Sequence, residues 1–75
     1  MRSLYDFLTN TDPETEVCVY DSHSHVLIFR DILSMWLYED VLSGKDWEVR
    51  GWEYNQTRDK VKVYVSPIKK EKVER

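Results

Sequence analysis

The sequence is poor in glycine and cysteine and has no long hydrophobic run, and each of these shortages excludes a class of protein. Two glycines are too few for the glycine-rich loops that cradle phosphates in nucleotide-binding proteins. A single cysteine, Cys18, cannot form an internal disulfide, which predicts a reducing compartment and a fold held together by packing. No stretch approaches the ~18 to 20 consecutive apolar residues that span a bilayer, and the first residues lack the apolar core of a signal peptide. We therefore expect a cytoplasmic protein without a membrane partner.

The composition is that of one small folded domain rich in aromatic side chains. Hydrophobic residues make up 41% of the 75 residues and charged residues 33%. A domain of this length buries only about 60% of the surface of its unfolded chain. Three tryptophans, five tyrosines and two phenylalanines are a heavy load for such a core, since each ring can bury about 150 to 250 Å². We expect part of this ring surface to lie at an interface.

Charge is distributed unevenly along the chain. Residues 1–55 carry 4 Lys and Arg against 11 Asp and Glu, a net charge of −7. Residues 56–75 carry 7 against 3, a net charge of +4, which leaves the whole chain at −3. The split indicates either an acidic binding face with a separate basic tail or neighbouring strands that neutralise each other.

The spacing of apolar residues predicts a short N-terminal helix and four strands. Leu4, Phe7 and Leu8 have the spacing of a helix. Ser3, directly before them, can cap its first turn. Alternating or continuous apolar runs bounded by turn residues predict the strands, over residues 16–21, 25–30, 46–54 and 60–65.

The main helix is predicted between the two middle strands. Leu33, Leu37 and Val41 recur at every fourth residue. Asp31 stands where an N-cap belongs, and Gly44 is expected to end the helix in the left-handed conformation that closes many helices. The resulting order α-β-β-α-β-β predicts an α+β fold, with a four-stranded, mainly antiparallel sheet and helices on one face.

Two further features concern the domain limits and the third strand. Residues 1–66 are predicted to form a single compact domain and residues 67–75 a charged, flexible C-terminal tail. The alternation of the third strand breaks at Gly51. A straight strand would turn Trp52 and Tyr54 away from the core face, and a β-bulge at Arg50-Gly51 would return both rings to it. We favour the bulge.

The sequence contains no catalytic, nucleotide-binding or metal-binding motif, so we predict neither enzymatic activity nor a cofactor. His23-Ser24-His25 is the only candidate metal-binding element, and Cys18 or Asp21 could supply a third ligand. Two imidazoles do not make a site, and we predict no metal. Cys18 lies between valines in a strand, which is typical of a small buried hydrophobe and not of a nucleophile.

Acidic and aromatic residues around the main helix and third strand indicate a surface for a basic protein partner. Acidic side chains near Asp46 and Glu48 would steer the partner, and an exposed ring, Trp52 or Tyr38, would anchor it. The predicted partner-binding residues are Tyr38, Glu39, Asp40, Asp46, Glu48, Trp52 and Glu53.

There are two alternative functions. Lysines beside an aromatic ring can bind nucleic acid, and the candidates are Lys60, Lys62, Tyr64, Lys69 and Lys70. The isoelectric point near 5.3 argues against direct nucleic-acid binding, and alternating lysines can also protect an edge strand from aggregation. The other alternative is a homodimeric interaction module that buries Met35, Tyr38 and Leu42 across a two-fold axis.

Four segments together carry a resemblance to a known class of proteins. They are Leu4-Tyr5-Asp6-Phe7-Leu8, Glu16–Asp21, Trp47-Glu48-Val49 followed by Trp52, and Val61-x-Val63-x-Val65. This hydrophobic pattern resembles small accessory proteins of bacteriophages and mobile elements, some of which are similar to anti-CRISPR inhibitors of CRISPR effector nucleases. The resemblance implies a protein that acts in the cytoplasm of a bacterial host by binding and blocking a host defence protein. It transfers no functional residue.

Overall fold

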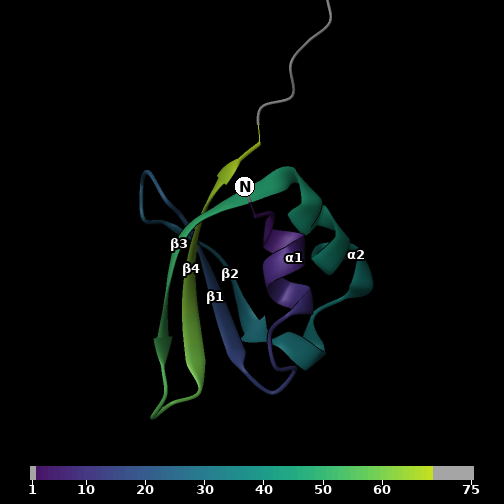
Figure 1. Ribbon diagram of the computed structural model, residues 1–75, viewed down its shortest axis with the longest axis vertical. Coiled ribbons are helices and arrows are strands. Elements are labelled where there is room, and N and C mark those ends of the chain that lie inside the picture. Colours follow the sequence, from purple (N-terminus) through teal and green to yellow (C-terminus); the bar gives the residue numbers. More distant parts are fainter. Residues whose placement is uncertain (1, 69–75) are drawn as a thin grey trace, which may run out of the picture.

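The four strands form one sheet, and both α-helices lie on the same side of it (Figure 1). The computed structural model describes residues 2–68 of the 75. Two of its elements, η1 and η2, are single 3-10 turns. In chain order the elements are α1 (Leu4–Thr9), β1 (Glu16–Asp21), β2 (Leu27–Ile32), η1 (Leu33–Met35), α2 (Tyr38–Ser43), η2 (Gly44–Asp46), β3 (Trp47–Asn55) and β4 (Lys60–Pro67). None of the helices in this part of the chain is long and apolar enough to cross a membrane.

The sheet is mixed, with the strand order β2-β1-β4-β3. Its two hairpins, β1–β2 and β3–β4, are antiparallel, and the two central strands β1 and β4 are parallel. The α+β class and the four strands are confirmed, and the expected mainly antiparallel sheet contains this one parallel pair. The segment through α2 carries the chain from one edge strand to the other, so β4 returns beside β1 in the same direction.

The core lies between the sheet and α1. Ser3 caps this helix, because its Oγ accepts a hydrogen bond of 3.1 Å from the Asp6 backbone N–H. Leu4, Phe7 and Leu8 are buried along one side of the helix, as their spacing predicts. They pack on inward-facing valines of the central strands, namely Val17, Val19, Val61, Val63 and Val65.

The predicted main helix is wrong over its first half. Asp31, the expected N-cap, continues β2 in the ladder with β1. Leu33–Met35 forms a 3-10 turn and Trp36 is extended, so α2 covers only Tyr38–Ser43. The Trp36 ring packs edge-on against Phe29 at 4.6 Å between centroids, and its Nε1 donates to the Asp31 carbonyl at 3.3 Å. These contacts hold the chain out of the helical conformation that the apolar spacing predicts.

Gly44 ends α2 as expected but not by the expected mechanism. Its backbone has φ −62° and ψ −14°, a right-handed helical conformation open to any residue. A Cβ atom at this position would lie 2.8 Å from the backbone nitrogen of Tyr5. Glycine is therefore required by the close approach of η2 to α1.

The predicted bulge in β3 is confirmed. The register between β3 and β4 shifts between Val49 and Gly51, which leaves Arg50 as the extra residue. The shift places Trp52 opposite Val63 and Tyr54 opposite Val61, on the side of the sheet that carries α1.

The predicted boundary between domain and tail falls within β4. Pro67 is the last residue of this strand, and the Ile68 backbone N–H donates to the Asp46 carbonyl at 2.9 Å. The remainder of the predicted tail, residues 69–75, lies outside the described residues.

Candidate nucleic-acid interface

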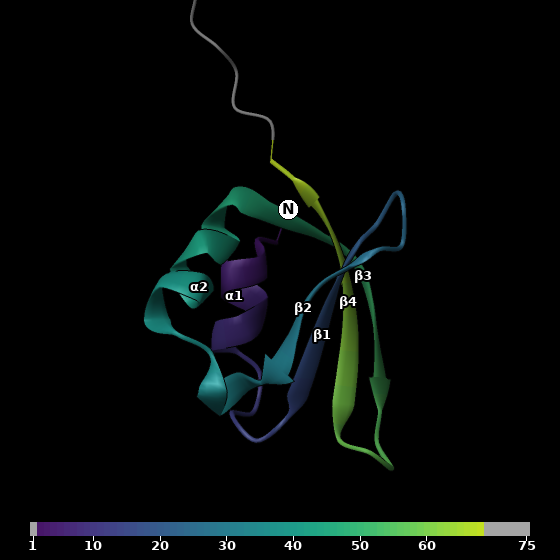
Figure 2. The same ribbon diagram turned by 180° about the vertical axis from the view of Figure 1, so that it is seen from behind.

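The face of the sheet that points away from α1 and α2 carries no helix (Figure 2). Strand alternation turns the valines of β1 and β4 inward, so the residues between them face outward. We call this surface the open face. It is formed by Tyr20 and Tyr64 with four cationic residues, Arg30, Arg58, Lys60 and Lys62.

Aromatic rings occupy one end of the open face. Tyr20 and Tyr64 are register partners on the two central strands, and their rings stack with centroids 5.5 Å apart and planes 28° apart. The ring of His25 lies 5.8 Å from that of Tyr64. His25 lies in the β1–β2 connection and has a φ of 63°, in the left-handed region. The two tyrosines are half-buried, so ring surface remains open to solvent.

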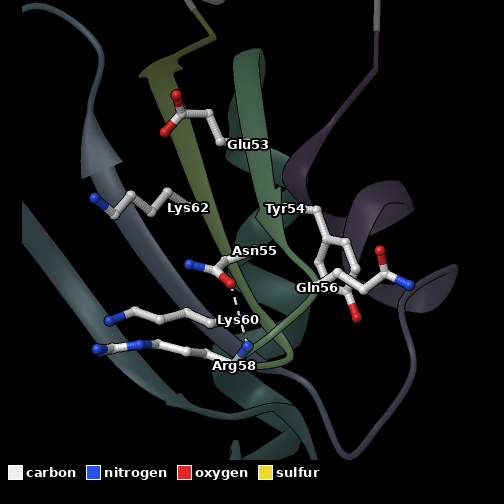
Figure 3. A pocket seen from close by; sticks show the side chains of 7 residues that line it. All are labelled: Glu53, Tyr54, Asn55, Gln56, Arg58, Lys60 and Lys62. Carbon is white, nitrogen blue, oxygen red and sulfur yellow. Dashed lines mark hydrogen bonds between the residues drawn. The ribbon is translucent and has the colours of Figure 1, made fainter.

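Cationic side chains occupy the other end, at the β3–β4 turn. A hollow of about 810 Å³ is lined there by residues of the two strands and the turn, including Glu53, Asn55 and Tyr54. Figure 3 shows the side chains of Arg58, Lys60 and Lys62 projecting side by side in one direction. The Arg58 backbone N–H donates to Asn55 Oδ1 at 3.1 Å, which fixes the turn that carries the arginine.

Cys18 marks the centre of this charge pattern. Its thiol is fully buried on the outward side of β1, and this burial raises the pKa of the thiol. The charges of Lys60, Arg30 and Lys62 lower the pKa, and that of Glu16 raises it. In the strand register Cys18 lies between Arg30 of β2 and Lys62 of β4, and Glu16 pairs with Lys60.

Carboxylates neutralise the open face only in part. Glu16 Oε2 lies 3.6 Å from Arg30 Nε, in an ion pair whose arginine side chain is largely exposed. Glu53 is the register partner of Lys62 on the adjacent strand. Within residues 2–68, neither Lys60 nor Lys62 forms an ion pair.

Lys60 and Lys62 do not protect an edge strand from aggregation, because they do not lie on one. Lys60 and Lys62 lie on β4, which has a neighbouring strand on both sides. Lysines that deter aggregation are needed on edge strands, which here are β2 and β3. Lys69 and Lys70, which complete the nucleic-acid set predicted from the sequence, lie outside the described residues.

The predicted partner-binding residues do not form one surface. Tyr38, Glu39 and Asp40 lie in the first turn of α2, and Asp46 ends η2. Glu48 and Glu53 face outward on β3, whereas Trp52 lies on the helix side. The carboxylate of Glu48 is 3.4 Å from Arg50 Nη1.

The candidate metal ligands are also dispersed. His23 and His25 are exposed in the β1–β2 turn, whereas Cys18 is buried. Asp21 Oδ1 accepts a hydrogen bond of 2.8 Å from the His23 backbone N–H, and this bond lowers the pKa of the Asp21 carboxyl. Across residues 2–68, no three His, Cys, Asp or Glu side chains gather as metal ligands.

Sequence reasoning missed half of the open face. Tyr20, Arg30 and Arg58 were not among the predicted nucleic-acid residues. The pairing of β1 with β4 and β2 brings Tyr20 and Arg30 to this face, and the β3–β4 turn brings Arg58. The alternation of Glu16–Asp21 places Tyr20 on the side opposite Val17 and Val19, which is the only signal the sequence offers. No family model, curated protein or solved structure matches this chain.

Proposed function

We propose that the protein is a non-enzymatic binding protein that holds single-stranded nucleic acid on its open face. The observation that carries this proposal is the position of the Tyr20–Tyr64 stack beside Lys60 and Lys62, on the outward side of the two central strands. Single strands are held elsewhere by this combination, in which bases stack on aromatic rings and cations follow the phosphates.

The dimensions of the open face suit a short piece of a strand. Tyr64 and Lys60 are separated by four residues of β4, a distance of about 13 Å along an extended chain. A base stacked on Tyr64 or Tyr20 therefore leaves its neighbouring phosphates within reach of the lysine and arginine side chains. Ring stacking does not select one base, so the proposed binding is tolerant of sequence.

The net charge of −3 is compatible with this proposal because four cations gather on the open face, where Glu16 and Glu53 neutralise them only in part. Charges on the exposed helix side act on a bound strand through solvent, where the Debye length is about 8 Å at physiological ionic strength. The cations of the open face lie in direct contact range. Local charge therefore decides the interaction more than the total.

The test measures binding of fluorescently labelled oligo-dT and oligo-U by anisotropy between about 50 and 200 mM salt. Lys60→Gln/Lys62→Gln should weaken binding and make the slope of log K against log salt less negative by about 0.7 for each lysine. Lys45→Gln is the matched control, since Lys45 lies in η2 with its Nζ 4.9 Å from the Tyr5 ring centroid. Equal affinity of the double variant and the natural protein, or no binding of either oligonucleotide at low salt, would refute the proposal.

A second candidate function is favoured by exposed apolar side chains around α2. Tyr38 is 74% exposed, Met35 65% and Leu37 63%, beside the carboxylate of Glu39. Apolar surface with an acidic rim suits a basic protein partner, and we propose as this alternative an inhibitor of a host defence protein such as a CRISPR effector nuclease. A homodimer through the same surface is the third alternative.

A pull-down from nuclease-treated lysate of phage-susceptible bacteria separates these alternatives, together with light scattering of the purified protein. An inhibitor predicts one stoichiometric protein that is lost with Tyr38→Ala and retained with Tyr64→Ala. A homodimer predicts a mass that falls to that of the monomer in Tyr38→Ala. If light scattering shows a monomer and the pull-down recovers no protein, both the inhibitor and the homodimer are refuted.

A further inference from the structure

A second hollow lies on the helix side of the sheet, between α1 and the bulged half of β3. Its volume is about 350 Å³. Tyr54 borders both hollows, and Figure 3 shows its side chain pointing away from Arg58, Lys60 and Lys62. We call this second hollow the aromatic pocket. It is distinct from the open face and takes no part in the proposed nucleic-acid binding.

Three aromatic rings form the walls of the aromatic pocket. Trp52 and Tyr54 are two residues apart on β3 and face the same side, with 56% and 49% of each residue exposed. Phe7 of α1 is buried and meets the Trp52 ring edge-on, at 5.8 Å between centroids. This contact orients the indole, so the pocket presents ring surface that the fold itself does not cover.

Two carboxylates, Asp12 and Asp59, line the pocket together with one cation, Arg2. Asp59 Oδ1 accepts two hydrogen bonds, from Tyr54 Oη at 2.8 Å and from the buried Thr15 Oγ1 at 2.9 Å. Among residues 2–68, no donor bonds the second oxygen of Asp59. The bond to Asp59 raises the pKa of Tyr54, and the charges of Asp59 and Asp12 raise it further, as expected beside an anionic site.

The backbone at Asp59 is held in place for this arrangement. Its φ is 50°, in the left-handed region where Asp and Asn are tolerated better than most residues. The Asp59 carbonyl accepts from the Glu16 backbone N–H at 3.1 Å, which ties the turn to the start of β1. The backbone and side-chain bonds therefore hold the carboxylate in place beside the Tyr54 hydroxyl.

We propose that the aromatic pocket binds the arginine side chain of a protein partner. A guanidinium group stacks on Trp and Tyr faces and donates from a planar fork to carboxylate oxygens, and the pocket offers both kinds of contact. The free oxygen of Asp59 matches the charge of a cation, and the ring faces of Trp52 and Tyr54 match the flat shape of the guanidinium group. An anionic ligand would lie beside the like charges of Asp12 and Asp59, which line the pocket.

Arg2 also lines the aromatic pocket and competes with such a ligand. Its side chain is exposed and forms no ion pair within the described residues. Removing the charge of Arg2 should therefore strengthen the binding of an arginine ligand and weaken that of an anion. The sign of this single effect distinguishes a cation site from an anion site.

The test follows the indole N–H signal of Trp52 by NMR in the full chain during titration with the blocked tripeptide Gly-Arg-Gly. Gly-citrulline-Gly, which is neutral and of nearly the same shape, is the control ligand. We expect saturable shifts with the arginine peptide, at least about two- to fivefold tighter than with the citrulline peptide. Arg2→Gln should tighten the arginine complex.

Asp59→Asn tests the carboxylate without disturbing the turn, because asparagine tolerates a positive φ and its carbonyl still accepts both hydroxyl groups. It should weaken arginine binding at least about twofold, and Trp52→Ala should abolish the saturable shifts of the neighbouring Tyr54 amide. Glu53→Gln removes one negative charge from the opposite side of β3, is the matched control, and should leave arginine binding in the aromatic pocket unchanged.

Three results would overturn the proposal. The first is equal binding of the arginine and citrulline peptides. The second is a Trp52 signal that moves on dilution without peptide, which would assign the pocket to a second copy of the chain. The third is a Trp52 signal that moves in Arg2→Gln alone while no peptide binds, which would assign the pocket to Arg2 itself. None of these results depends on whether the open face binds nucleic acid.

Discussion

Tyr20 and Tyr64 stack across the parallel pair of central strands, with ring centroids 5.5 Å apart. The two residues are far apart in the sequence, and only the crossover from one hairpin to the other makes them neighbours. Paired across the two strands, the rings form one continuous aromatic surface. This surface is the structural reason to propose that bases stack on the open face.

Tyr64→Ala should weaken the binding of single-stranded nucleic acid by a factor of about 5 to 150, the range that corresponds to the loss of one base–ring stack of about 1–3 kcal/mol. Tyr64→Phe keeps the ring and should bind nearly as the natural protein does. Anisotropy titrations of both variants measure the effect, and circular dichroism verifies their fold. Equal losses in Tyr64→Ala and Tyr64→Phe would show that the hydroxyl, and not stacking, matters.

Gly44→Ala should destabilise the protein because the added Cβ meets backbone and not a flexible side chain. The new atom would lie 2.8 Å from Tyr5 N and 3.2 Å from the carbonyl carbon of Leu4. Overpacking of this kind costs about 1–3 kcal/mol, which lowers Tm by at least about 4 °C in a domain of this size. Thermal unfolding followed by circular dichroism measures the shift.

Gly51→Ala is the matched control for this prediction. Nothing lies within 4 Å of a Cβ at Gly51, and its φ is not positive. Alanine there should leave stability unchanged or raise it by about 0.5–1 kcal/mol, because it reduces the freedom of the unfolded chain. Similar losses in both variants would contradict the claim that close approach is what requires Gly44.

Leu8→Ala should lower stability by about 2–5 kcal/mol, since Leu8 is buried in the core beneath α1 and its removal leaves a cavity. Leu37→Ala removes the same atoms from an exposed position before α2 and should change stability by less than about 0.5 kcal/mol. Urea unfolding at one pH measures both. A large loss in Leu37→Ala would place that side chain in a contact, such as a dimer interface, which the monomer does not contain.

How much the sequence reveals depends on whether the decisive contacts are local. The strands, the helix after Ser3 and the bulge at Gly51 follow from alternation and capping, and all three were predicted. The helix expected from Asp31 fails because the Trp36 ring packs on Phe29, a contact that no spacing rule describes. Local sequence patterns therefore predict which elements form more accurately than they predict how long each element is.

The candidate site was predictable only in part for the same reason. Alternation in β4 places Lys60, Lys62 and Tyr64 on one side, which the sequence indicates directly. That Tyr20 and Arg30 join them depends on the parallel pairing of β1 with β4, and no residue pattern selects that pairing over its alternatives. The aromatic pocket requires a turn residue, Asp59, to meet rings of β3, and it was not foreseen.

The pKa of the buried Cys18 thiol responds to the charges on the open face, so it can be used to test them without a ligand. Its pKa in the folded protein is raised above the usual 9.0, chiefly by burial. The unfolded chain therefore ionises first as pH rises, so the contribution of Cys18 to stability is full below about pH 9 and is lost as pH rises towards the folded pKa. Comparing urea unfolding of the natural protein and Cys18→Ala between about pH 7.5 and 10.5 isolates this loss from that of the tyrosines.

The same experiment on Lys60→Gln/Lys62→Gln tests the electrostatic basis of the proposed function. Both lysines lower the pKa of the Cys18 thiol, so their removal should raise that pKa further and extend the loss of stability to higher pH. Lys45→Gln, which removes an equal charge from η2, should leave the pH dependence unchanged. If the effect of Cys18→Ala has the same pH dependence in the double variant and in the natural protein, the two lysines do not act on the thiol.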